Sequence, residues 1–148
     1  MLHKVRTAAT KDEVLGLMEP LIRDWFQSKF KGLTEPQAYA VPLIHARKSV
    51  LVSSPTGSGK TLTAFLSIIN ELYAKQLRGE LENRIYCLYV SPLKALANDI
   101  NRNLEEPLRE LTELALKEGK PEPQVRVGVR SGDTSSQERQ KQARRPPH

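Results

Sequence analysis

Hydrophobic positions along the chain follow two different periods. Over 14–26 and 60–77 the apolar residues recur every three or four positions, which predicts amphipathic helices. Short apolar runs at 50–52 and 85–90, and an alternating run at 124–129, predict strands. Because unbroken apolar runs are typical of strands covered on both faces, the pattern indicates an α/β fold with a mostly parallel sheet.

Capping and breaking residues set the expected helix ends. Thr10 with Glu13, and Thr34 with Gln37, have the spacing of a capping box, so helices are expected to begin there. Pro20 is expected to kink or split the first helix, because its ring cannot continue a regular helix. Further helical stretches are expected over 95–100, over 107–116 starting afresh at Pro107, and from about 137.

Composition narrows the class of protein only slightly. The 148 residues suit a single domain, and the net charge of +6 favours an anionic partner, although many basic proteins bind none. The one cysteine, Cys87, lies in an apolar run and cannot form an internal disulfide, so a buried thiol in a reducing compartment is expected. No window approaches the ~20 apolar residues of a membrane span, and no signal core opens the chain. We therefore expect a cytoplasmic protein without a membrane partner.

The stretch "SSPTGSGKT" at 53–61 lies between a predicted strand and a predicted helix. Gly57 and Gly59 allow backbone N–H groups to converge on a phosphate, and the helix that follows adds free N–H groups and its positive dipole end. Lys60 would lie at the β- and γ-phosphates, and the Thr61 hydroxyl would bind Mg²⁺. Ser54 stands where the general phosphate-loop pattern has glycine. The alternative is a plain strand–turn–helix junction that uses glycine for tight geometry.

Several motifs together resemble those of superfamily 2 helicases. "SPTGSGKT" is similar to their motif I variant that lacks the first glycine, and "YVSPLKALANDI" at 89–100 is similar to motif Ia. "FKGLTEPQAYAVPLI" at 30–44 looks like their glutamine-bearing lead-in, "RSGDT" at 130–134 like a loop that contacts nucleic acid, and "ARRPPH" like the lead-in to motif Ib. The set most resembles the large helicase-related family (Lhr), with Ski2-like helicases next, over about 26–148.

The resemblance implies a P-loop NTPase (RecA-like) fold, a three-layer parallel sheet with helices on both faces, here incomplete. It implies a helical lead-in at 1–33 and part of the first RecA-like domain at 34–148. It implies binding of ATP and Mg²⁺, with Thr61 as metal ligand and Gln37 on the adenine edge; the alternative is that Gln37 serves only the capping box, and both roles could coexist. The implied nucleotide-binding residues are Gln37, Pro55, Thr56, Gly57, Ser58, Gly59, Lys60 and Thr61.

The same resemblance implies contacts with the backbone of DNA or RNA. The candidate residues are Ser91, Pro92, Lys94, Arg130, Gly132, Asp133 and Thr134. Phosphate contacts at a helix start give no base readout, so they do not separate DNA from RNA. Lys94 could be an ordinary solvated lysine, Asp133 could cap the helix that follows, and the basic stretch 139–145 could be a solvated helix face.

Turnover of ATP in this class of motor needs carboxylates that hold Mg²⁺ and orient water. No apolar run ending in adjacent acids follows the glycine loop. The sequence therefore predicts the ATP-binding part of an ATP-dependent helicase that needs further helicase domains, and that is marginally stable alone. The alternative is a truncated module that binds ATP or nucleic acid without ATPase activity. An unrelated P-loop kinase or transferase is disfavoured by the segment that resembles motif Ia.

Overall fold

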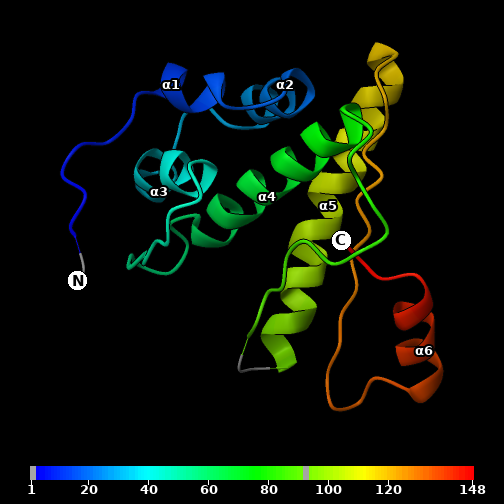
Figure 1. The fold of residues 1–148 in the computed structure, drawn as a ribbon. Coiled ribbons are helices and arrows are strands. Elements are labelled where there is room, and N and C mark those ends of the chain that lie inside the picture. Colours follow the sequence, from blue (N-terminus) through cyan, green and yellow to red (C-terminus); the bar gives the residue numbers. More distant parts are fainter. Residues whose placement is uncertain (1–2, 92–93) are drawn as a thin grey trace. The chain divides into compact units, whose positions relative to one another are not determined.

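The computed structural model describes residues 3–91 and 94–148, and of 94–103 it describes the helical backbone alone. The described chain divides into two compact units, Met1–Glu71 and Leu72–His148, with the boundary inside α4. The helices in chain order are α1 (Lys11–Gly16), α2 (Pro20–Lys29), α3 (Glu35–His45), α4 (Lys60–Leu77), α5 (Lys94–Glu118) and α6 (Ser136–Arg144) (Figure 1). None of these described helices is long and apolar enough to cross a membrane.

The helix starts expected in the first unit are confirmed. Thr10 and Glu13 form the predicted capping box, in which Thr10 N–H donates to Glu13 Oε2 at 2.7 Å. Pro20 splits the predicted helix, because α1 ends at Gly16 and Pro20 occupies the first turn of α2. Thr34 caps α3, and its N–H donates to Gln37 Oε1 at 2.8 Å. The predicted helix 60–77 is confirmed as α4.

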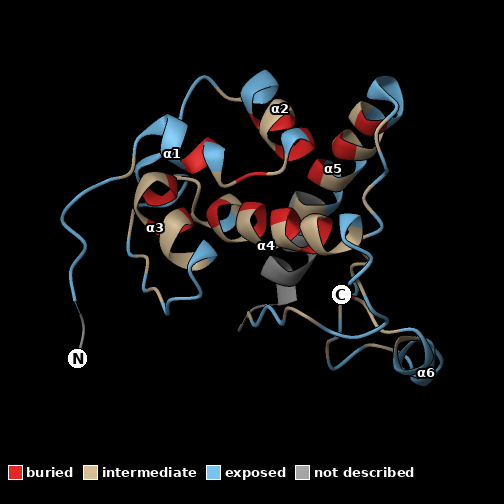
Figure 2. Cartoon of the chain, turned by 45° about the horizontal axis from the view of Figure 1, so that its top comes forward, coloured by how far each residue is buried: buried red, intermediate tan, exposed pale blue. Residues whose placement is uncertain are grey.

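The core of the first unit is built from the apolar faces of α1 to α4 (Figure 2). Asn70 on α4 fastens the junction between α1 and α2, because its Oδ1 accepts from Glu19 N–H at 2.7 Å and its Nδ2 donates to Leu17 O at 3.1 Å. The N-terminal half of α4 is therefore fixed against the helices that precede it. The buried apolar residues are Val14, Leu15, Met18, Leu21, Ile22, Trp25, Phe26, Ala40, Val41, Phe65, Leu66 and Ile69.

The expected break before Pro107 is wrong, since α5 runs without interruption from Lys94 to Glu118 with Pro107 inside it. A proline within a helix removes one backbone hydrogen bond, at a cost of about 3 kcal/mol. Buried apolar positions after it, at Leu111 and Ala115, keep the helical spacing. Their burial offsets the lost bond, which the local sequence rule does not count. The helix ends where expected, with Gly119 at φ 63°.

Side chains of α4 hold the segment that follows α5 in the second unit. The Tyr73 hydroxyl donates to Pro121 O at 2.8 Å, and Tyr73 is 2% exposed. Gln76 Nε2 donates to Glu122 O at 2.7 Å, and Gln124 N–H donates to Gln76 Oε1 at 2.6 Å. The start of the predicted strand 124–129 is thereby fixed to α4.

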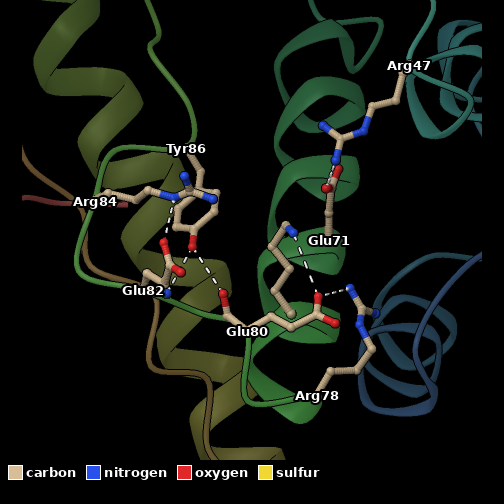
Figure 3. Close-up of polar contacts among 8 residues, drawn as sticks. Arg47, Glu71, Arg78, Glu80, Glu82, Arg84 and Tyr86 are labelled. Carbon is tan, nitrogen blue, oxygen red and sulfur yellow. Dashed lines mark hydrogen bonds and ion pairs between the residues drawn. The ribbon is translucent and has the colours of Figure 1, made fainter.

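A polar cluster holds the turn that follows α4 (Figure 3). The Tyr86 hydroxyl accepts from Glu82 N–H at 2.9 Å and donates to Glu80 O at 3.1 Å. The hydrogen bond from Glu82 N–H is the main cause that lowers the pKa of Tyr86, because it favours the phenolate. Arg84 lies over the Tyr86 ring, 4.8 Å from its centroid, and pairs with Glu82 at 3.2 Å. The first residues of the predicted strand 85–90 are fixed by these contacts.

The three predicted strands are not formed within residues 3–91 and 94–148, because the segments 50–52, 85–90 and 124–129 are extended or irregular there without strand pairing. A strand needs neighbours that take up its N–H and C=O groups, and only the second unit shows a beginning of this. There Tyr86 and Cys87 N–H donate to His148 O at 2.5 and 2.9 Å, and His148 N–H donates to Arg126 O at 2.9 Å. Apolar side chains that a sheet would cover are exposed, namely Leu51, Ile85, Leu88, Tyr89 and Val90.

Two smaller expectations in the second unit are settled. The cap of α6 is Ser135, whose Oγ accepts from Glu138 N–H at 3.2 Å, so the alternative of Asp133 as cap is wrong. Ser135 can cap the helix because it has the extended backbone that an N-cap residue needs, at φ −61° and ψ 153°. Cys87 is half-buried rather than buried, and burial raises the pKa of its thiol, as expected for an unreactive cysteine.

Candidate nucleotide-binding site

The glycine loop leads directly into α4 (Figure 1). Gly57 and Gly59 adopt left-handed backbone angles, with φ of 81° and 85°. Ser58 N–H donates to Pro55 O at 3.3 Å and closes a turn. The Ser54 and Ser58 hydroxyls lie 2.7 Å apart in a hydrogen bond. Ser54 keeps an ordinary negative φ, so the loop does not require glycine at the position where the general pattern has one.

Lys60 is the first residue of α4, and its side chain lies along the loop. Its Nζ donates to Ser54 O and to Pro55 O, the second at 2.7 Å. The cation is therefore held against two carbonyl oxygens of the loop, and the third N–H of the ammonium is left to donate. Thr63 steadies the helix start, because its N–H and its Oγ1 donate to Gly59 O at 2.9 and 2.8 Å.

The glutamine-bearing segment meets the glycine loop at Thr34. A Cβ added to Gly59 would lie 3.1 Å from Thr34 Oγ1 and 3.2 Å from Thr34 Cγ2, so the backbone approaches this side chain closely. Thr34 in turn is bonded to Gln37, which is 2% exposed. Gln37 Oε1 accepts from Thr34 N–H, and a carbonyl oxygen has a second lone pair for another donor. The capping role of Gln37 is therefore confirmed.

The geometry suits a phosphate-bearing ligand. The first N–H groups of an α-helix lack intrahelical acceptors, and α4 has 18 residues with no acidic residue in its first turn. Thr56, Gly57 and Thr61 are exposed at this end, so the turn is open to solvent. Thr61 offers one hydroxyl to a metal ion. No cluster of three or more His, Cys, Asp or Glu side chains that could hold a metal occurs in the part of the chain that the structure describes.

The predicted nucleic-acid residues fall into two groups. Ser91 ends the segment before α5, and its Oγ is buried without a hydrogen-bond partner among the described residues. Pro92 lies outside the described residues. Lys94 is the first residue of α5, and its side chain also lies outside the described part. The structure therefore confirms the helix start at Lys94.

The second group, 130–134, forms a turn against α6. Arg130 donates to Gln142 Oε1 at 3.2 Å and to Arg139 O at 3.3 Å. Ser131 N–H donates to Thr134 Oγ1 at 2.8 Å. The next two residues are exposed at its tip: Gly132 and Asp133. The turn predicted from sequence is confirmed, and internal hydrogen bonds already hold much of its polar surface.

Thr34 is the residue of this site that sequence reasoning missed. Its local signal, the capping box with Gln37, predicted a helix start and nothing more. Its contact with Gly59 joins positions that are far apart in sequence, and no local pattern records such a contact. Arg126 was likewise missed, although its guanidinium group donates three hydrogen bonds in the second unit.

Comparison with known proteins supplies the class. The sequence profile of "DEAD/DEAH box helicase" matches residues 34–147. The chain belongs to the DEAD/DEAH box helicase family. Within it, the chain is 53% identical over its whole length to "ATP-dependent helicase Lhr-Core protein 2" of Thermococcus barophilus, and 51% identical over its whole length to "ATP-dependent helicase Lhr-Core" of Methanothermobacter thermautotrophicus. It spans 17% of the length of each of these relatives.

A solved structure shows the same relationship. The helicase Lhr of Mycobacterium smegmatis, bound to single-stranded DNA and AMP-PNP, matches with a TM-score of 0.81 and 44% identity. The match covers 90% of this chain and 16% of that one. The fold of the described chain is therefore that of a segment of a helicase.

Proposed function

We propose that the chain is the ATP-binding part of an ATP-dependent DNA or RNA helicase. The observation that carries the proposal is the open turn of two left-handed glycines at the start of α4, with Lys60 held over it. The names of the relatives support it, since they are ATP-dependent helicases, and the similar Lhr structure contains AMP-PNP and single-stranded DNA. In the complete enzyme, ATP binding and hydrolysis would drive movement along a nucleic-acid strand.

In this proposal each part of the loop has a distinct role. Backbone N–H groups of the loop surround the triphosphate, Lys60 neutralises its β- and γ-phosphates, and the Thr61 hydroxyl is a ligand of Mg²⁺. Gln37 faces the adenine edge through its amide, while Thr34 keeps it close to the loop. The remaining loop contacts come from the main chain of Pro55, Thr56, Gly57, Ser58 and Gly59.

We assign the strand contacts to the second unit. In sequence, Ser91 and Pro92 come shortly before α5, and Lys94 is its first residue; free N–H groups at a helix start favour a backbone phosphate. Arg130, Gly132, Asp133 and Thr134 would add contacts from the turn before α6. Phosphate contacts of this kind serve DNA and RNA alike.

We further infer that the extended segments become strands of a RecA-like sheet in the longer protein. The consecutive residues Leu88, Tyr89 and Val90 are 80%, 49% and 77% exposed, and neighbouring strands of a sheet would cover such an apolar run. In this proposal 1–33 form a helical lead-in and 34–148 form part of the first RecA-like domain. The carboxylates needed for turnover would come from the rest of the longer protein, and its compartment would be the cytoplasm, as the single Cys87 favours.

A runner-up is a module that binds ATP or nucleic acid without hydrolysing ATP. Both proposals require the loop to bind a nucleotide. They differ only in whether ATP is turned over when the remaining helicase domains are present.

Titration of the chain with AMP-PNP tests the proposal. We expect calorimetry to show saturable 1:1 binding that weakens by about 10-fold when Mg²⁺ is removed, because the metal shields adjacent phosphate charges. ATP should compete with AMP-PNP, and adenosine should compete poorly because it lacks the phosphates. Equal competition by adenosine and ATP would show that the loop does not hold the triphosphate.

A further inference from the structure

A cationic pocket in the second unit has no part in the proposed nucleotide site. It is a cavity of about 430 Å³ whose lining includes Asn83, Arg126, Arg144, Arg145 and His148. This volume is in the range of small-ligand sites. The lining also contains one carboxylate, Glu82, which is paired with Arg84 at 3.2 Å. The side chains that line the cavity therefore include three guanidinium groups and one carboxylate, which is already paired.

Arg126 is fixed in place within this pocket. Its Nε and Nη2 donate to Pro146 O at 3.1 and 2.9 Å, and Nη2 also donates to Asn83 Oδ1 at 2.5 Å. His148 closes the same wall, because its Nδ1 accepts from Arg126 N–H at 3.0 Å. A guanidinium held in this way loses little conformational freedom when it meets an anion, so the wall is preorganised.

Arg144, the last residue of α6, and Arg145, its C-cap, differ from the other cations of this helix. Lys141 lies 3.9 Å from Glu138, and Arg139 donates to Thr134 O and Ser131 O at 2.9 Å. Arg144 and Arg145 are exposed at the end of the helix, and neither forms an ion pair within the described residues. Two guanidinium groups thus face solvent at the mouth of a pocket whose inner wall carries a third.

The charge state of His148 agrees with this arrangement. Burial lowers the pKa of His148, and the positive charges of Arg126 and Arg145 lower it further. The imidazole is therefore expected to be neutral at pH 7. A positive potential that disfavours imidazolium is the same potential that favours an anion.

We propose that this pocket is a phosphate-binding site, and that it holds the phosphodiester backbone of a single nucleic-acid strand. The choice of a strand rests on the proposed function, because a helicase segment meets such a strand, while the phosphate chemistry rests on the pocket alone. Guanidinium groups suit phosphate because their N–H groups donate in pairs to two oxygens. The site uses residues other than those of the glycine loop and the start of α5.

The test compares two variants that remove positive charge from the same unit. Arg144→Ala/Arg145→Ala removes both exposed pocket guanidinium groups, and the control Arg109→Ala removes an exposed arginine that pairs with Glu113 on α5. Binding of a fluorescein-labelled single-stranded 20-mer is followed by anisotropy over a range of salt concentrations. We expect the pocket variant to bind the strand at least about 10-fold more weakly, and the slope of log affinity against log salt concentration to be smaller in magnitude by about 2. Arg109→Ala should change the affinity about 2-fold at most.

Further variants and measurements separate binding of a strand from binding of free phosphate, and a loss of binding from a loss of folding. Arg144→Lys/Arg145→Lys keeps the charge and should recover only part of the affinity, because lysine cannot donate in a paired geometry. Calorimetry with pyrophosphate reports the phosphate alone: if pyrophosphate binding depends on the two arginines while strand binding does not, the pocket binds free phosphate groups. α6 has no buried residues, so thermal unfolding should be unchanged in all variants.

Equal strand affinity and equal pyrophosphate binding in the pocket variant and in Arg109→Ala would overturn the proposal. AMP-PNP binding measured on the same samples keeps this result separate from the proposed function. If the chain binds no AMP-PNP but the Arg144→Ala/Arg145→Ala variant binds the strand more weakly, the pocket proposal stands and the nucleotide-site proposal fails. If the chain binds AMP-PNP but the variant binds the strand and pyrophosphate normally, the nucleotide-site proposal stands and the pocket proposal fails.

Discussion

Lys60→Ala is expected to weaken AMP-PNP binding by about 10- to 100-fold. A hydrogen bond to a charged group contributes about 1.5–3 kcal/mol, and each 1.4 kcal/mol is a factor of ten in affinity. The Lys60 ammonium already lies over the loop, where it donates to Ser54 O and Pro55 O. Its removal takes away the one side-chain cation of the loop, and calorimetry measures the loss directly.

Lys48→Ala is the matched control for this prediction. Lys48 is an exposed lysine of the same unit, so the variant changes net charge equally without touching the loop. Lys60→Arg keeps the positive charge and should retain more affinity for AMP-PNP than Lys60→Ala. Its guanidinium group is larger than the ammonium group that it replaces, so the fit differs from that of lysine. If Lys60→Ala and Lys48→Ala bind AMP-PNP equally well, Lys60 does not contact the phosphates.

Gly59→Ala is expected to destabilise the chain by about 2–3 kcal/mol, against about 1 kcal/mol for Gly57→Ala. Both glycines have left-handed angles, which cost a residue with a side chain roughly 1–2 kcal/mol. Only Gly59 has a close neighbour, because its added Cβ would lie 3.1 Å from Thr34 Oγ1, while a Cβ at Gly57 meets nothing within 4 Å. The additional destabilisation of Gly59→Ala over Gly57→Ala comes from the close contact with Thr34, and its size is typical of overpacking. Urea denaturation of both variants measures it.

The second change Thr34→Ser tests whether the additional destabilisation by Gly59→Ala arises from the contact with Thr34. Serine keeps the capping hydroxyl but lacks Cγ2, which an alanine at position 59 would approach at 3.2 Å. Gly59→Ala combined with Thr34→Ser should therefore be more stable than the sum of the two single changes predicts. Equal denaturation midpoints for Gly57→Ala and Gly59→Ala would show that the loop does not press against Thr34.

Local rules predicted the parts of the fold that depend on neighbouring residues. The two capping boxes, the split at Pro20 and the whole of α4 follow from patterns within a few positions of each other. The glycine loop was predicted for the same reason, because its geometry depends on residues of one short segment. The resemblance to helicases, which the sequence profile confirms, rests on these local motifs.

The predictions that were wrong or that stayed open depend on contacts between positions far apart in the sequence. The segments 50–52, 85–90 and 124–129 have strand-forming residues, but a strand exists only where a partner takes up its hydrogen bonds. Pro107 was expected to break a helix that tertiary burial of Leu111 preserves. The approach of Gly59 to Thr34 also joins distant residues.

The central claim is that the backbone amides of the glycine loop bind a triphosphate. Nuclear magnetic resonance of the ¹⁵N-labelled chain, titrated with Mg²⁺ and AMP-PNP, measures each amide separately. The account predicts large, saturable shifts for the N–H groups of Gly57, Gly59, Lys60 and Thr61, with a smaller shift for the Gln37 side-chain amide. A titration that leaves these amides unshifted, whether or not other residues respond, would contradict it.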